Sequence, residues 1–185
     1  MFFPVIVLDI DNQGLEFIHA ADSEISVFHN KAFHHVGWLK NDVPYLIMPL
    51  EKSPDNTTVM CAKNVEEIFF GVDEVIPTNA RFLQFFDANK DQRFDAYDTP
   101  YEYGYLWFDR NKDGICTPDE VMPLSAFGIT INLDFERVFE QLEGYHTLNY
   151  RFTFSVDYVD KDGNHIQRDG LQGYDIALHA IPYHY

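Results

Sequence analysis

Oxygen-bearing side chains recur at alternate positions in residues 109–120. Asp109, Asn111 and Asp113 stand at positions 1, 3 and 5 of a twelve-residue stretch, and Glu120 stands at position 12. Calcium takes six to eight oxygen ligands, and an EF-hand-type loop supplies them from positions 1, 3, 5, 7, 9 and 12. Residues 109–120 are therefore predicted to bind calcium.

The other positions of this loop fit the same template. Gly114 stands at position 6, where the loop needs a sharp turn; Ile115 would offer its carbonyl, and Thr117 a direct or water-mediated contact. Thr117 also begins a capping-box pattern with a proline after it, which predicts a helix over residues 121–127. The alternative is a surface turn that binds nothing, but such a turn does not need an acid at position 12.

A second stretch, residues 87–98, follows the template less closely. Gln92 replaces the glycine, so it must accept a left-handed backbone or distort the turn, and the shorter Asp98 ends the loop. We expect weaker binding here, and a vestigial loop that only packs on its neighbour is the alternative. The ligand positions of this loop are Asp87, Asn89, Asp91, Arg93, Asp95 and Asp98.

The two stretches form a short internal repeat, because residues 86–91 match residues 108–113 with their first aspartates 22 positions apart (109 − 87). Aromatic-rich segments of near-helical length precede each acidic loop between residues 80 and 128. This spacing predicts a pair of helix-loop-helix units.

The rest of the chain favours β-structure. Short apolar runs separated by turn residues predict strands in the first part, followed by a surface loop at residues 51–58 and a short helix or strand at 65–71. After residue 134, alternating apolar residues predict a hairpin that turns at residues 160–164; its aspartates resemble a partial ion loop, but a turn explains them. The expected fold is one α+β domain: a β-rich part (1–75), an EF-hand-like pair (80–128) and a C-terminal hairpin (134–185).

Composition limits the partners. Thirty Asp and Glu against thirteen Lys and Arg give a formal net charge of −17, which disfavours nucleic acid and anionic membranes and favours cations or a basic protein partner. The 46% hydrophobic content predicts a packed core and no disorder. The apolar start reaches Asp9 too early for a signal peptide or a spanning helix, so it is expected to form a buried strand. We expect no membrane insertion.

The sequence gives little support for an enzyme or for a transition-metal site. No phosphate-binding glycine loop, nucleophile elbow or His-Glu-x-x-His motif is present, so the sequence nominates no catalytic residue. Eight histidines lack a tight zinc spacing, and we expect them on the surface or in the hairpin.

Residues 106–115, Leu-Trp-Phe-Asp-Arg-Asn-Lys-Asp-Gly-Ile, are followed by Glu120 and by Phe-Gly-Ile at 127–129. This stretch resembles the "RVWxDxNxDGI...EL...LGI" segment of the calcium-dependent self-processing and calcium-binding modules of RTX-type secreted bacterial proteins. Residues 87–98 resemble that family's "LDxNxDxxIxxxD" loop, and residues 4–14 its opening "PxxLDLDGDG".

The resemblance implies calcium as cofactor, a secreted bacterial protein, and Asp9 and Asp11 as further candidate ligands. It also implies calcium-triggered cleavage of an Asp-Pro bond, in which the aspartate attacks its own carbonyl. Here Phe3 precedes Pro4 and offers no nucleophile. We therefore expect a non-catalytic calcium-binding module; the alternatives are an autoprocessing module and an acidic interaction module that holds calcium structurally.

Overall fold

The computed structural model describes residues 1–29, 32–48 and 79–183, and antiparallel strands dominate this part of the chain. The strands are β1 (Phe2–Leu8), β2 (Phe17–Ile18), β3 (Ser26–His29), β4 (Ala32–Val36), β5 (Trp38–Leu39), β6 (Tyr45–Ile47), β7 (Arg93–Phe94), β8 (Tyr105–Trp107), β9 (Val121–Pro123), β10 (Thr130–Asn132), β11 (Glu136–Gln141), β12 (Thr147–Val159) and β13 (His165–Pro182). One α-helix, α2 (Asn79–Phe86), is described.

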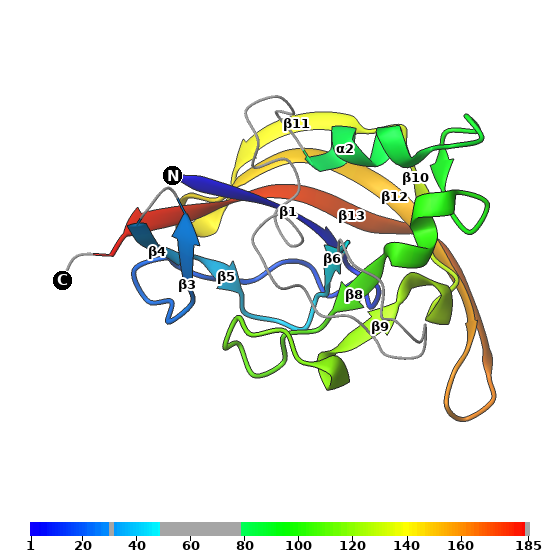
Figure 1. Ribbon diagram of the computed structural model, residues 1–185, viewed down its shortest axis with the longest axis horizontal. Coiled ribbons are helices and arrows are strands. Elements are labelled where there is room, and N and C mark those ends of the chain that lie inside the picture. The colour runs from blue at the N-terminus through cyan, green and yellow to red at the C-terminus, as the bar shows by residue number, and fades with distance from the viewer. Residues whose placement is uncertain (30–31, 49–78, 184–185) are drawn as a thin grey trace.

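Eleven of these strands form one sheet (Figure 1). Its main path runs β7-β10-β12-β13-β1-β6-β8-β9. Off this path, β11 pairs with β12, β4 pairs with β13, and β3 pairs with β4. Strands β2 and β5 form a separate pair. Strand β1 lies in antiparallel register with β13 from Phe2 opposite His179 to Leu8 opposite Gly173. The apolar start of the chain is thus a central strand, as predicted.

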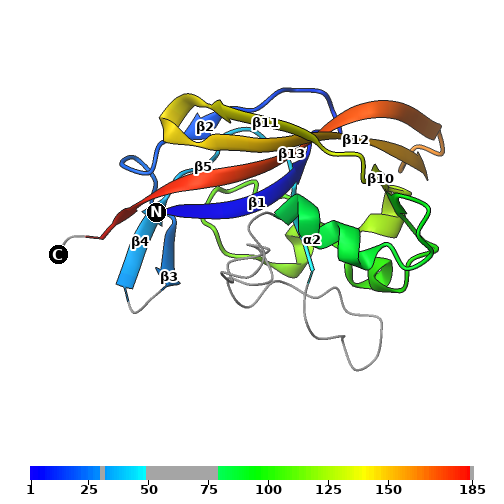
Figure 2. The same cartoon turned by 90° about the horizontal axis from the view of Figure 1, so that it is seen from above.

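The core has two parts, one on each face of the sheet, and alternate residues of β1 contribute to both. Val5 and Val7 pack with Trp38 and Trp107 on one face, whereas the alternate residue Ile6 packs on the other face with the buried side of α2. In Figure 2, α2 lies along one side of the sheet, and β11 runs beside its partner β12.

The C-terminal hairpin is confirmed. Strands β12 and β13 pair along most of their length, and the backbone N–H groups of Asp162 and Asn164 donate to Oδ1 of Asp160 in the turn, at 2.9 and 2.8 Å. The alternate apolar residues of β12 face the core, as expected. The buried residues are Leu148, Tyr150, Phe152, Phe154 and Val156.

The expected α+β fold with paired helix-loop-helix units over residues 80–128 is wrong. Helix α2 precedes the first loop, but a 3₁₀ helix, Thr99–Tyr103, follows it, and β8 follows directly. The second loop ends in a single 3₁₀ turn, Pro118–Glu120, which leads directly into β9, and β9 pairs with β8.

Local chemistry explains why residues 121–127 form strand β9 and a short 3₁₀ helix, Leu124–Ala126, in place of an α-helix. Val121 is β-branched, and Pro123 disfavours helical backbone at the residue before it and lacks an N–H. The capping pair itself is present: the backbone N–H of Thr117 donates to Oε2 of Glu120 at 3.4 Å. A capping box therefore marks the start of a turn here and not of a long helix. The loop predicted at residues 51–58 and the element at 65–71 lie outside the described residues.

Candidate functional site: two acidic loops

The two predicted loops share one backbone scaffold. In each, the first aspartate accepts the backbone N–H groups four and five positions on, at 3.2 and 3.0 Å for Asp109 and at 3.2 and 3.1 Å for Asp87. In each, the asparagine at position 3 donates its side-chain amide to the aspartate at position 5, at 2.7 Å for Asn111 and 3.1 Å for Asn89. Residues 87–98 therefore have the same turn as residues 109–120.

Gln92 takes the left-handed backbone that its position requires. Its φ is 66°, close to the 69° of Gly114 at the same position of the other loop. The lysines at position 4, Lys90 and Lys112, have φ of 63° and 60°. Of the two outcomes that the sequence allowed for Gln92, the strained backbone is the one found, at a cost of about 1 kcal/mol.

Each loop is closed by its position-12 carboxylate. Asp98 accepts the backbone N–H of Ala88 at 2.8 Å and that of Asp95 at 3.0 Å. Glu120 accepts the indole N–H of Trp107 at 3.3 Å as well as the Thr117 amide. These bonds bring the last residue of each loop back toward the first.

Four loop carboxylates are buried. Asp87, Asp98, Asp109 and Glu120 are between 2% and 7% exposed, and within the described residues none forms an ion pair with a lysine or arginine. Burial raises the pKa of Asp109 above its usual value, and the nearby charge of Glu120 raises it further, against the lowering by hydrogen bonds from Gly114 and Trp38. Buried anions without a cationic partner are costly.

An aromatic cluster supports the second loop. Trp38 donates its indole N–H to Oδ2 of Asp109 at 2.7 Å, and the Trp38 ring lies 4.6 Å from Tyr45 and 5.7 Å from Trp107. The sequence motifs described above did not predict Trp38 at this site. The 71 positions that separate it from Asp109 leave no local pattern from which the contact could be read.

The remaining predicted ligands occupy the outer side of the loops. Thr117 and Asp95 are half-buried, and the others are exposed: Asn89, Asp91, Arg93, Asn111, Asp113 and Ile115. In residues 1–29, 32–48 and 79–183, no three His, Cys, Asp or Glu side chains converge closely enough to hold a metal ion. Calcium in this template also uses the amide oxygen of position 3 and the carbonyl of position 7. The donor set, hard oxygens at positions 1, 3, 5 and 12, fits calcium chemically.

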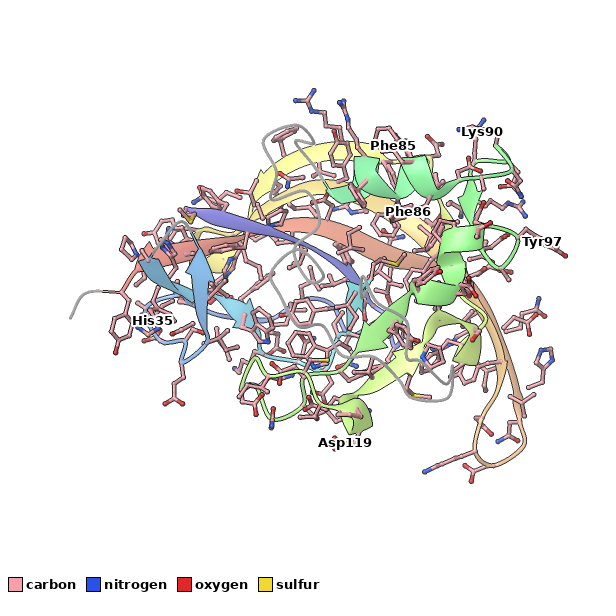
Figure 3. All side chains as sticks on the ribbon, in the orientation of Figure 1. His35, Phe85, Phe86, Lys90, Tyr97 and Asp119 are labelled. Atoms are coloured by element: carbon pink, nitrogen blue, oxygen red, sulfur yellow. The ribbon has the colours of Figure 1, made fainter. Side chains whose placement is uncertain are left out.

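The two loops do not pair with each other as EF-hand loops do. Strand β7, which holds Arg93 and Phe94 at positions 7 and 8 of the first loop, pairs with β10, whereas Ile115 and Cys116 of the second loop lie in no strand. Figure 3 labels Lys90 and Tyr97 on the first loop and Asp119 on the second, at separate edges of the molecule. The chain therefore holds two independent loops.

A third turn repeats the same first-position geometry. Asp9 accepts the backbone N–H of Gln13 and that of Gly14, both at 2.8 Å, and Asp11 lies 3.7 Å from the guanidinium of Arg168. Asn12 has a φ of 53°, as position 4 of the other loops does. The two candidate ligands that the resemblance suggested, Asp9 and Asp11, thus lie in a turn of the same type.

The histidines are not all on the surface or in the hairpin. His34 is 5% exposed and His146 is fully buried, where Nδ1 of His146 accepts the backbone N–H of His179 at 2.9 Å. The expectation is therefore wrong for His34, whereas His146 lies within the predicted hairpin region, residues 134–185, and is buried there.

Together, the sheet and the loops define a β-rich domain that carries acidic, tightly hydrogen-bonded turns at its edges. The chain belongs to the SPM domain family, whose model matches residues 6–170. No curated protein sequence matches the chain. The described residues contain no helix of sufficient length and apolarity to span a membrane.

Proposed function

We propose that the protein is a calcium-binding module of the kind found in RTX-type secreted bacterial proteins, and that calcium stabilises it without any catalysis. The observation that carries the proposal is the shared scaffold of residues 87–98 and 109–120. Two segments with the calcium-loop pattern adopt the same turn, hold their first and last carboxylates buried, and give them no cationic side-chain partner among the described residues.

A divalent cation would relieve the cost of these buried charges. In the second loop the charge of Glu120 raises the pKa of Asp109, because the two carboxylates repel each other, and a bound cation would attract both. Binding would require the Glu120 carboxylate to turn from the Trp107 indole toward Asp109, and would thereby change the surroundings of Trp107. The loops lack the regular exiting helices of EF-hands, so affinities of about 10⁻⁴ to 10⁻³ M, typical of extracellular modules, are expected.

Self-processing is the weaker reading. Phe3 supplies no carboxylate, and the Phe3–Pro4 bond lies within β1, where Phe3 is 1% exposed and opposite Leu178. A bond in a central strand is also poorly placed for an attacking group. An acidic interaction module for a basic partner remains compatible with the charge of −17, but no described contact favours it.

Calorimetry on metal-stripped protein tests the proposal. Calcium should release or absorb heat with a stoichiometry of one or two ions, and magnesium should bind more weakly, because it demands a tighter octahedral shell than these loops provide. The two tryptophans should report the same event by fluorescence, since both contact loop carboxylates. An absence of both signals at millimolar calcium would refute the proposal.

A further inference from the structure

An open cleft lies beside the first acidic loop. It consists of two adjoining hollows of about 530 and 740 Å³, which share Gln92 and Asp134 in their walls. Both volumes fall within the range of small-molecule sites. The inner hollow is lined by residues of β7, β10 and β12, and the outer one by residues of α2 and the loop between β10 and β11. Figure 3 shows Phe85 of α2 and Lys90 of the acidic loop at the same edge of the molecule.

The wall of the cleft contains strained backbone. Gln92 and Lys90 both have positive φ, and the other loop has glycine where this one has Gln92. Glycine would adopt the turn without the steric cost. The Gln92 side chain lines both hollows. The loop turn itself imposes this backbone, so the presence of glutamine where glycine would fit without strain points to a role for its side chain in the cleft.

Hydrogen bonds join the elements that line the cleft. The backbone N–H of Leu133 donates to the carbonyl of Gln92 at 3.0 Å, and the side-chain amide of Gln84 donates to the carbonyl of Leu133 at 3.2 Å. On the floor, the Asn132 amide donates to Oγ1 of Thr153 at 2.7 Å. These contacts join α2, the loop and β12 into one preorganised frame.

The charges of the cleft nearly balance. Four basic side chains line it, in a chain with only thirteen, together with three acidic ones, and Arg151 lies 3.8 Å from Glu136. Such a lining attracts neither a highly charged anion nor a highly charged cation. It offers many donors and acceptors side by side. The charged residues are Arg81, Lys90, Arg93, Arg151, Asp91, Asp134 and Glu136.

Aromatic faces accompany these polar groups in the outer hollow. Phe85 is 74% exposed, which is unusual for a residue of its size, and Phe135 and Tyr150 line the same hollow with ring centroids 6.3 Å apart. A sugar ring has an apolar C–H face that packs on an aromatic ring, and hydroxyl groups at its rim that each donate and accept hydrogen bonds. The cleft presents both kinds of surface.

We propose that this cleft binds an uncharged oligosaccharide, with sugar hydroxyls on the polar side chains of the inner hollow and a sugar face on the aromatic rings of the outer one. Gln92, between the hollows, reaches both parts of the ligand. The site takes a different ligand from the calcium loop but shares residues with it: positions 4 to 7 of the first loop form its wall, and Asp91 and Arg93 among them are also predicted calcium ligands. On the proposed function, calcium in that loop also strengthens sugar binding.

Titration of the full chain with maltotetraose, cellotetraose and N-acetylated chitotetraose, by calorimetry in millimolar calcium, tests the site. At least one of the three is expected to bind. Gln92→Gly keeps the left-handed turn and removes the side chain, so it should weaken that binding roughly three- to tenfold, the loss of about one hydrogen bond. Asn12→Gly makes the same kind of change at a positive φ outside the cleft and should leave sugar affinity unaltered.

The outcomes separate the two proposals. If no tetrasaccharide binds, if Gln92→Gly binds as tightly as the wild type, or if a tetra-aspartate or tetra-lysine peptide binds in their place, the sugar site is refuted. Sugar binding that is equal in calcium and in chelator supports the cleft and counts against calcium in the first loop. Sugar binding that weakens in chelator supports both.

Discussion

The indole N–H of Trp38 lies 2.7 Å from Oδ2 of Asp109, a bond between two buried side chains from distant parts of the chain. The same oxygen also accepts the backbone N–H of Gly114 at 3.0 Å. Trp38 thus fixes the first residue of the acidic loop to the core face that it shares with Tyr45. The position of this loop depends on the core as well as on its own sequence.

Trp38→Phe should lower the free energy of unfolding more than Trp107→Phe does. Both indoles are fully buried, so the cavity costs are similar, but Trp38 loses the shorter bond, 2.7 Å against the 3.3 Å from Trp107 to Glu120. Leaving the Asp109 carboxylate short of a donor adds about 1–3 kcal/mol. Urea unfolding of both variants measures the difference, and equal losses would show that the Trp38 bond contributes little.

Calcium should raise the melting temperature, and chelator should lower it. Ligand that binds only the folded state stabilises it by RT ln(1 + [L]/Kd), which is about 0.4–1.4 kcal/mol when millimolar calcium is one to ten times Kd. Asp109→Asn should reduce the calcium-dependent part of the shift, because it removes one of the repelling charges and one ligand charge together. Calorimetric melts across a calcium series decide this, and a melting temperature that is the same in chelator and in millimolar calcium contradicts the prediction.

How much of this could be read from sequence differs between elements. The hairpin β12–β13 and the buried β1 were predicted, because period-two alternation and a short apolar run are local signals. The repeat of residues 86–91 in residues 108–113 was interpreted as a pair of helix-loop-helix ion loops; the two turns share their geometry, the paired helices are absent from the described residues, and ion binding stays a prediction.

The elements after each loop were not predicted. A capping box followed by apolar residues indicates a helix, yet residues 121–123 extend the sheet because β8 offers an unpaired edge. That edge is a tertiary feature, and pairing with it outweighs a weak local preference. The contact of Trp38 with Asp109 and the burial of His146 depend in the same way on residues far apart in sequence.

Glu120→Gln should cost more calcium affinity than Asp98→Asn. Glutamate at position 12 can bind calcium through both oxygens, whereas the shorter Asp98 is held by two backbone N–H groups. Without calcium, Asp98→Asn should lower the free energy of unfolding more than Glu120→Gln does. Its amide N–H₂ would face one of those backbone donors, which should cost about 1–3 kcal/mol of stability. Calcium titrations and chelator melts of both variants test the two halves separately. A larger affinity loss from Asp98→Asn would make the first loop the principal site.

Two buried groups should give stability opposite dependences on pH. Burial, together with the charges of His179 and His19, lowers the pKa of His146 from 6.5 to about 4 against a raising effect of Glu143. The unfolded chain then binds a proton that the folded chain does not, so this contribution to stability falls as pH falls from about 6.5 to 4. Burial raises the pKa of Asp175 from 3.8 to about 6, so its contribution rises as pH falls from about 6 to 3.8.

Single variants should separate these contributions. His146→Phe removes the acid-sensitive group, so relative to the wild type its unfolding free energy should rise by up to about 3 kcal/mol between pH 6.5 and 4. Asp175→Asn retains an oxygen for the N–H of Ala80 at the start of α2, a bond of 2.8 Å, and removes the charge, so relative to the wild type it should lose a similar amount over pH 6 to 3.8. Urea unfolding at half-unit pH steps provides the differences, which cancel the titration of the other carboxylates. Burial lowers the pKa of the His146 imidazole and raises the pKa of the Asp175 carboxyl, so the two differences should have opposite signs. Differences of the same sign for both variants would contradict this prediction.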